Sequence, residues 1–134
     1  MTKKKKPEFE LQKSVVNYLK LKHKNVLYCA SAGGMRTNIR TAVSMKASGY
    51  IKGFPDLFLY EPSPCGRYHG LAIELKVRGN YPSPEQKKWI RDLQDRGYFA
   101  QVCTGFDEAI GCIEHYINPD KLHYTAPDSD FDCF

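Results

Sequence analysis

The chain of 134 residues lacks several features that would place it in a familiar class. No apolar run approaches the length of a membrane span, and residues 1–7 contain four lysines in place of the hydrophobic segment of a signal peptide. We therefore expect an intracellular, cytoplasmic protein with no membrane partner. No internal repeat divides the sequence, and its length suits one domain that can bury a core.

Cysteine and histidine are few and poorly spaced for a zinc site. The five cysteines are odd in number and form no C-x-x-C pair, which argues against a disulfide framework or a structural zinc ion. The four histidines show no metal-ligand spacing either. Cys29 and Cys103 fall in strand-like runs, where we expect a buried thiol that packs as a small hydrophobic group.

Negative charge is concentrated at the end of the chain. The net charge is +5, with 20 Lys and Arg spread along the sequence, while Asp128, Asp130 and Asp132 crowd the last residues. The body is therefore more basic than the total suggests, which favours an anionic partner such as nucleic acid. A solvated surface explains the same excess of charge equally well.

The acids and the lysine on which the functional interpretation depends lie in, or directly before, two short apolar runs. Gly53-Phe54-Pro55-Asp56 precedes the run at 57–60, and a second run at 71–77 contains Glu74 and Lys76. Both runs are rich in branched and aromatic residues and are bounded by Gly and Pro, so both are predicted strands.

The spacing within these runs predicts a cation site. Residues two apart on a strand share a face, about 6.6 Å apart, so Glu74 and Lys76 point the same way. A turn at 62–66 favours antiparallel pairing of the two strands, which would bring Asp56 beside Glu74 at one edge of the sheet, facing solvent. Two close carboxylates repel unless a cation neutralises them, and hard oxygen ligands suit magnesium. With a lysine nearby to orient or deprotonate a water, this set of groups suits hydrolysis of a phosphodiester.

The first predicted helix spans Pro7 to His23. Its apolar stripe consists of Leu11, Val15, Val16 and Leu19. Glu8 lies within this stripe, which has two explanations: a first-turn acid that interacts with the helix dipole, or an acid that points toward the site. The spacing alone favours the first.

A second helix is predicted over residues 35–48, ended by Gly49. Arg36 and Arg40 lie four apart on one of its faces, with Lys46 farther along and Lys52 in the loop beyond. Basic residues beside glycines suit close approach to a phosphate backbone, although an ordinary surface helix shows the same pattern.

The clearest helix start is Ser83-Pro84-Glu85-Gln86. Ser83 suits the N-cap, Pro84 the first helical position, and Gln86 completes a capping box. Gln86 also lies on the apolar face with Trp89, as Glu8 does on the first helix, and capping is a good explanation of its position. Strands at 26–30 and 98–103, a helix over 109–117 and a tail from Asp120 complete the predicted order.

These elements in this order resemble the PD-(D/E)XK nuclease superfamily and, within it, the VRR-NUC family, whose small stand-alone members occur in phages and bacteria. The resemblance covers roughly Glu8 to Ile113. The motifs that carry it are Glu8 with Leu11-Gln12, Gly53-Phe54-Pro55-Asp56, Ile73-Glu74-Leu75-Lys76, and Ser83-Pro84-Glu85-Gln86 followed by Trp89 and Leu93.

The resemblance implies a restriction-endonuclease-like α/β core, with a mixed, mostly four-stranded sheet flanked by helices. It implies one nuclease domain over residues 8–118, between a basic tail at 1–7 and an acidic tail at 119–134. The implied activity is that of a Mg²⁺-dependent endodeoxyribonuclease, with Mn²⁺ as a substitute and DNA as the partner.

Site roles follow from the resemblance residue by residue. Asp56 and Glu74 become metal ligands together with the backbone carbonyl of Leu75, and Lys76 positions the attacking water. Glu8 would contact the metal directly or through water. Gln86 would brace the site. The residues expected to contact DNA are Arg36, Arg40, Lys46, Lys52 and Arg78.

Two other functions stay open at this stage: a DNA-binding module without turnover, and a metal-dependent phosphoesterase with a small substrate. The intact set of acids and lysine argues against the first, and the many basic residues argue against the second. Stand-alone members of the family resemble dimeric resolvases of four-way junctions, so we expect a homodimer that acts on branched DNA. Candidate contact residues for the dimer are Tyr50, Phe54, Tyr68 and Tyr81.

Overall fold

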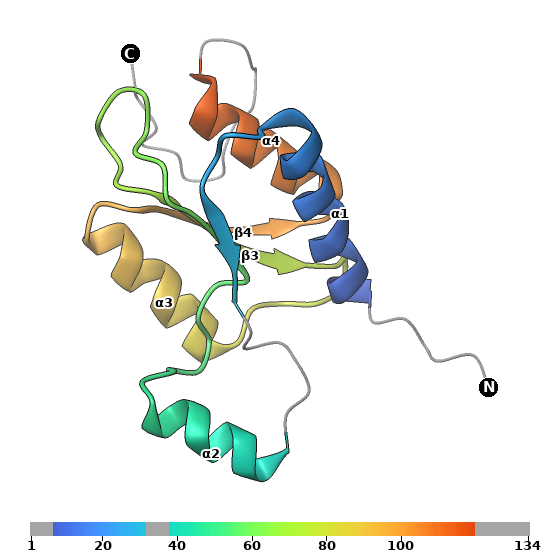
Figure 1. The fold of residues 1–134 in the computed structure, drawn as a ribbon, viewed down its shortest axis with the longest axis vertical. Helices are drawn as coiled ribbons and strands as arrows, with labels where there is room; N and C mark the ends of the chain where they lie inside the picture. Colours follow the sequence, from blue (N-terminus) through green and yellow to red (C-terminus); the bar gives the residue numbers. More distant parts are fainter. Residues whose placement is uncertain (1–6, 32–37, 120–134) are drawn as a thin grey trace, which may run out of the picture.

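The structure is a computed structural model that describes residues 7–31 and 38–119 (Figure 1). The elements lie close to the segments predicted for them, except that the start of the second predicted helix lies outside the described residues. In chain order they are α1 (Pro7–Lys22), β1 (Tyr28–Ala30), α2 (Ile39–Ala47), β2 (Leu57–Leu59), β3 (Leu71–Lys76), α3 (Pro84–Asp95), β4 (Phe99–Thr104) and α4 (Phe106–Ile117).

The sheet has four strands in the order β1-β2-β3-β4. The pairs β1–β2 and β2–β3 are antiparallel and β3–β4 is parallel, which confirms the predicted mixed sheet. Leu57 pairs with Ile73, so one step farther along the register sets Asp56 opposite Glu74. The expectation that these acids line an edge of the sheet is wrong in one respect. They lie at the end of two central strands, because β1 and β4 flank the pair.

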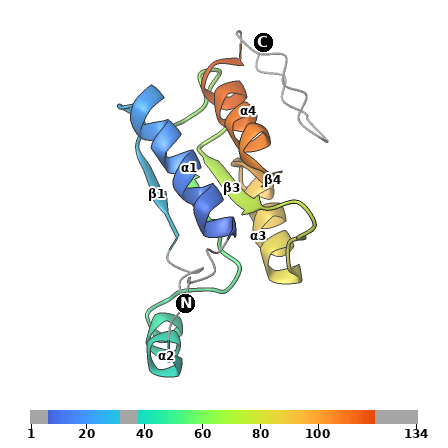
Figure 2. The same ribbon diagram turned by 90° about the vertical axis from the view of Figure 1, so that its right-hand side faces the viewer.

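Helices cover both faces of the sheet. Helices α1 and α4 lie side by side on one face and α3 lies on the other (Figures 1 and 2). On β3, Leu71, Ile73 and Leu75 belong to the core cluster that includes α1 and α4, and Ala72 belongs to the cluster that includes α3. All six residues of β3 are buried. The alternation of a strand therefore places Glu74 and Lys76 on the α3 face, inside the covered part of the sheet.

Helix α2 projects from this body (Figure 2). The Asn38 side chain caps it by accepting from the Thr41 N–H, and none of its residues is buried. Ile39 and Val43, one turn apart, are both exposed. The segment is thus a surface helix, as its sequence pattern allowed.

Whether a cysteine on the sheet is buried depends on whether helices cover its strand. Cys103 on β4 is buried, as expected, but Cys29 on β1 is exposed. The expectation for Cys29 is wrong because Tyr28 takes the position facing the core, and α3 covers β3 and β4 rather than the edge strand β1. Among the helices that the structure describes, none is long and apolar enough to cross a membrane.

A polar cluster joins α1 to α4 at the end of α1 that lies away from Glu8. The Tyr18 hydroxyl donates to Glu114 Oε1, His23 Nε2 contacts the same oxygen, and Asn118 Nδ2 donates to Oε2 at 3.2 Å. Burial raises the pKa of Glu114, but the hydrogen bonds from Tyr18, His23 and Asn118 outweigh burial and lower it below its ordinary value. Burial and the Glu114 charge raise the pKa of Tyr18 to about 12. The ionised carboxylate is therefore the form that holds the two helices together.

Removing this carboxylate should destabilise the fold in a pH-dependent way. Glu114→Gln should lower the unfolding free energy at pH 7 by about 1–2 kcal/mol, because hydrogen bonds to a charged acceptor are lost. Because the pKa of Glu114 is lower in the folded protein than its ordinary value of 4.5, the carboxylate stabilises the fold fully above pH 4.5. This stabilisation is lost as the pH falls through the folded-state pKa. Thermal melts from pH 7 to pH 3 should show the gap between the proteins closing below pH 4.5. Asp95→Asn, an exposed acid on α3, is the control, and a gap that stays constant with pH would contradict the assignment.

Candidate active site

The loop that leads to Asp56 is fixed against the start of α3. Gly53 has a φ of +94°, and a Cβ atom on it would lie 2.7 Å from the backbone carbon of Glu85. Trp89 Nε1 donates to the Lys52 carbonyl at 3.1 Å, one residue earlier in the loop. Only glycine satisfies both the left-handed backbone and the close approach. The Gly53-Phe54-Pro55-Asp56 motif thereby sets where the carboxylate of Asp56 enters the site.

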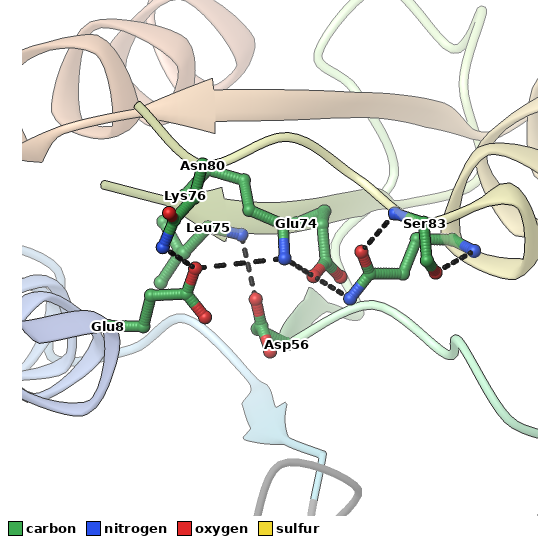
Figure 3. Close-up of polar contacts among 8 residues, drawn as sticks. Glu8, Asp56, Glu74, Leu75, Lys76, Asn80 and Ser83 are labelled. Carbon is green, nitrogen blue, oxygen red and sulfur yellow. Dashed lines mark hydrogen bonds and ion pairs between the residues drawn. The ribbon is translucent and has the colours of Figure 1, made fainter. Parts of the chain in front are cut away.

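The two carboxylates meet at the end of β3 (Figure 3). Asp56 Oδ2 accepts from the Leu75 N–H at 2.8 Å. Glu74 Oε1 accepts from Gln86 Nε2 at 2.7 Å, and Gln86 Oε1 accepts from the Ser83 N–H at 2.8 Å. In the part of the chain that the structure describes, Glu74 Oε2 is buried and has no hydrogen-bond partner. One carboxylate oxygen is thus withdrawn from water without a hydrogen-bond donor to replace it.

Lys76 lies between the acids of β3 and α1. Its Nζ is 3.6 Å from Glu74 Oε1 and 3.7 Å from Glu8 Oε1. Asn80 Nδ2 donates to the same Glu8 oxygen at 3.3 Å. Glu8 occupies the first turn of α1 and also points into the site (Figure 3), so both explanations of this acid describe part of its position. The capping box of α3 forms as predicted, and Gln86 contacts Glu74 as well.

The electrostatics follow from this burial. Burial and, after it, the charge of Asp56 raise the pKa of Glu74 to about 8, while the charge of Lys76 opposes the rise. Burial also raises the pKa of Asp56, against the hydrogen bond from the Leu75 N–H and the charge of Lys76. The expectation that both acids face solvent is wrong for Glu74, which is only 1% exposed, because β3 is central and covered on both faces. Without a further positive charge, the pair favours retaining a proton.

These residues fit a hard divalent cation. The unpartnered Glu74 oxygen and the repulsion between the carboxylates are what a cation would relieve, and Mg²⁺ accepts one or two carboxylates with the remaining ligands from water and phosphate. The Leu75 N–H points at Asp56, and since the N–H and C=O of a strand residue point to the same side, its carbonyl faces this acid too. Within the described residues no three His, Cys, Asp or Glu side chains converge closely enough to hold a metal alone. Glu8 therefore does not complete a three-acid set.

The structure brings together Glu8, Asp56, Glu74, Leu75, Lys76 and Gln86, and their roles as ligands and catalysts stay predictions. The basic residues expected at DNA are not in this cluster. Arg40 and Lys46 are exposed on α2, Lys52 is exposed in the loop before Gly53, and Arg78 is exposed after β3. Arg36 lies outside the described residues.

Two residues near the site were not singled out by the sequence for it. Asn80 contacts Glu8, and the turn-forming pair Gly79-Asn80 was a signal that could have indicated a loop folding back there. Burial and the charges of Glu74 and Asp56 raise the pKa of Tyr50, so its hydroxyl lies within electrostatic reach of both acids. The sequence analysis names Tyr50 only as a candidate contact residue for a dimer, and no local sequence pattern predicts that it approaches the acids.

Comparison with known proteins finds one domain type. A family model described as the VRR-NUC domain matches residues 1–107. A solved structure titled "VRR_NUC domain protein" is 34% identical, covers 86% of this chain and 91% of its own, and has a TM-score of 0.71. Another, titled "VRR_NUC domain", is 22% identical, covers 81% and 96%, and with a TM-score of 0.53 supports the fold alone. No curated protein matches the chain.

The close approach of Gly53 to α3 can be tested against a glycine with the same backbone angle. Gly53 and Gly79 both have a φ of +94°, but a Cβ on Gly79 would meet nothing within 4 Å. Each substitution by Ala should cost about 1–2 kcal/mol for the left-handed backbone. Gly53→Ala should cost about 1–3 kcal/mol more, because the loop and α3 must separate. Chemical denaturation measures the difference, and equal losses in the two variants would contradict this account of the loop.

Proposed function

The chain belongs to the VRR-NUC family of nuclease domains, and from this premise we propose that it is a divalent-metal-dependent endonuclease that hydrolyses DNA phosphodiester bonds. The observation that supports the proposal is the pair of adjoining carboxylates, Asp56 and Glu74, with one buried unpartnered oxygen and Lys76 beside it. A buried arrangement of like charges costs folding free energy, so its presence at the end of a central strand favours a role in chemistry.

Each residue of the cluster has a task in this proposal. Asp56 and Glu74, with the Leu75 carbonyl, would hold Mg²⁺ or Mn²⁺, which when bound supplies a water of lowered pKa and neutralises phosphate charge. Gln86 fixes the orientation of the Glu74 carboxylate. Lys76 aligns the attacking water and offsets the charge that develops on the phosphate, and Glu8 holds the Lys76 ammonium in place. In-line attack that leaves a 5′-phosphate is what the family resemblance implies.

The distribution of charge supports DNA as the substrate. No Asp or Glu occurs between Glu10 and Asp56, so the rest of α1, then β1, α2 and the loop before Asp56, belong to a segment without acidic side chains. Where the structure describes them, the basic residues of this segment are exposed and free to approach phosphates. Its eight basic residues are Lys13, Lys20, Lys22, Lys24, Arg36, Arg40, Lys46 and Lys52.

Cleavage should depend on a divalent cation and on both carboxylates. Asp56→Asn and Glu74→Gln should each abolish cutting of labelled DNA in Mg²⁺, and EDTA should do the same to the unchanged protein. Gln86→Ala should lower the rate about 10- to 100-fold, a typical loss when the partner that orients a metal ligand is removed. Ca²⁺ should support binding without cleavage.

The control for these variants is Asp95→Asn, which removes an exposed acid from the far end of α3 and should cut normally. Glu74→Gln should melt no lower than the unchanged protein in EDTA, because a neutral amide of the same shape replaces a buried carboxyl group whose charged form is costly. Cleavage that persists in EDTA or in either carboxylate variant would exclude the mechanism. DNA binding without cleavage in any divalent ion would favour the silent binding module.

Lys76 should affect rate more than affinity. Its charge acts mainly where negative charge builds in the transition state, and the loss of one such group costs about two to three orders of magnitude in rate. Lys76→Ala and Lys76→Met should show this loss in single-turnover cleavage, with little change in DNA affinity measured in Ca²⁺. Lys88→Ala, which removes an exposed lysine paired with Asp92, is the control. Weak binding at an unchanged rate would make Lys76 a phosphate contact instead.

We extend the proposal to a homodimer that makes paired nicks in branched DNA. One site cuts one strand per encounter, and a two-fold pair is the commonest way to supply a second. Of the aromatic residues considered for the contact surface, Phe54 packs on Trp89 and Tyr68 packs on Phe99 within the chain. The exposed Ile39 and Val43 of α2 leave apolar surface for a partner copy.

Light scattering and a junction assay test this assembly together. We expect a mass twice that of the 15.3 kDa chain and symmetric incisions in a four-way DNA junction. A monomer that cuts a flap and leaves the junction whole would contradict the dimer while leaving the nuclease proposal intact.

A further inference from the structure

Tyr81 is the most exposed aromatic residue in the part of the chain that the structure describes, at 84%. It lies in the loop between β3 and α3, which is attached to the site on both sides of this residue. On one side Asn80 donates to Glu8, and on the other the Ser83 N–H donates to Gln86, which in turn contacts Glu74. The exposed ring therefore belongs to a loop that the site itself holds in place.

The backbone of this loop is restricted as well as attached. Tyr81 precedes Pro82, and a residue before proline is confined to extended conformations. Pro84 follows at the first position of α3, after the Ser83 cap. A tyrosine side chain has only two rotatable bonds, so holding it against a ligand costs little conformational entropy. A large apolar ring is thus presented to solvent from a backbone of restricted conformation.

Chain geometry keeps the backbone of Tyr81 near the proposed cleavage point. Successive Cα atoms are about 3.8 Å apart, so Tyr81 is one such step from the residue that contacts Glu8 and two from Ser83. Stacked nucleotides repeat about every 3.4 Å along a strand. A base within one or two nucleotides of a phosphate at Asp56 and Glu74 is therefore within reach of the Tyr81 ring.

We infer that Tyr81 is a specificity-determining residue that stacks on a nucleobase next to the cleaved phosphodiester. The inference rests on the proposed nuclease function and specifies which DNA structures the site selects. In a continuous duplex both faces of a base pair are covered by its neighbours, so the ring finds a free face only where stacking is interrupted. Single strands, flaps and branch points offer such a face. The exposed Arg78 in the same loop supplies a positive charge for the adjoining phosphate.

The test compares two DNA substrates of the same sequence, one fully paired and one with unpaired nucleotides at the cleavage point. Tyr81→Ala should lower cleavage of the interrupted substrate about tenfold or more, because stacking by one aromatic residue contributes that much. Cleavage of the paired substrate should stay near that of the unchanged protein. Tyr81→Leu, which keeps apolar bulk without a ring, should behave like the alanine variant, and Tyr81→Phe should restore cleavage. Tyr60 is the control: it is an exposed tyrosine at the end of β2 opposite to Asp56, and Tyr60→Ala should change neither cleavage rate.

A binding measurement separates failure of this inference from failure of the nuclease proposal. A 2-aminopurine base at the unpaired position should lose fluorescence when the unchanged protein binds in Ca²⁺, and should not lose it with Tyr81→Ala. If no DNA is cut in Mg²⁺ or Mn²⁺ but the quenching follows the ring, the nuclease proposal fails and the stacking role stands. Suppose instead that the protein cuts DNA. The stacking role is then wrong if Tyr81→Ala slows cleavage of both substrates equally, or of neither. It is also wrong if the fluorescence is still quenched by the Tyr81→Ala variant. Melting temperatures of all variants confirm that each is folded.

Discussion

The arrangement of this protein depends on the burial of the Glu74 carboxylate beside Asp56. A carboxylate in a protein interior is costly unless a proton, a hydrogen-bond donor or a cation compensates its charge. Here Gln86 and Lys76 compensate one oxygen, and the other has no partner among the described residues. The groups that do compensate come from α3 and from β3 itself, with Glu8 of α1 behind Lys76. The relative placement of these three elements therefore decides whether the carboxylate is tolerable.

Gln86 shows how a rule of local structure can also serve a distant site. Its main chain and one end of its amide complete the capping box with Ser83, and the other end of the amide holds Glu74. The sequence presented capping and bracing as alternatives, and the geometry shows that one side chain does both. Because an amide has a donor end and an acceptor end, the cap fixes which end faces the carboxylate. The start of α3 and the orientation of the acid are thereby a single structural unit.

Much of the fold was predictable from the sequence because the deciding signals are local. The stripe of α1 predicts the burial of Val15 and Leu19, the capping motif predicts the start of α3, and the short apolar runs predict the strands. The pairing of Asp56 with Glu74 also followed, since a short connection favours antiparallel neighbours.

The features that the sequence did not predict depend on elements far apart in the chain. Glu74 is buried because β4 and α3, both later in the sequence, complete the sheet and cover it. The direction of Glu8 depends on where α1 lies relative to β3, which its own periodicity does not determine. The positions of Asn80 and Tyr50 depend on the paths of two loops. In each case the deciding contact spans elements whose relative placement no short pattern encodes.

The isolation of α2 from the core has a consequence for its dynamics and its evolution. A helix that buries none of its own residues adds little to the free energy that holds the sheet and the other helices together. Its amide hydrogens should exchange with solvent through local opening, long before those of β3. For the same reason, substitutions on α2 are nearly free of any penalty in global stability. The surface that this helix presents can change among relatives while the carboxylate pair and its supports stay fixed.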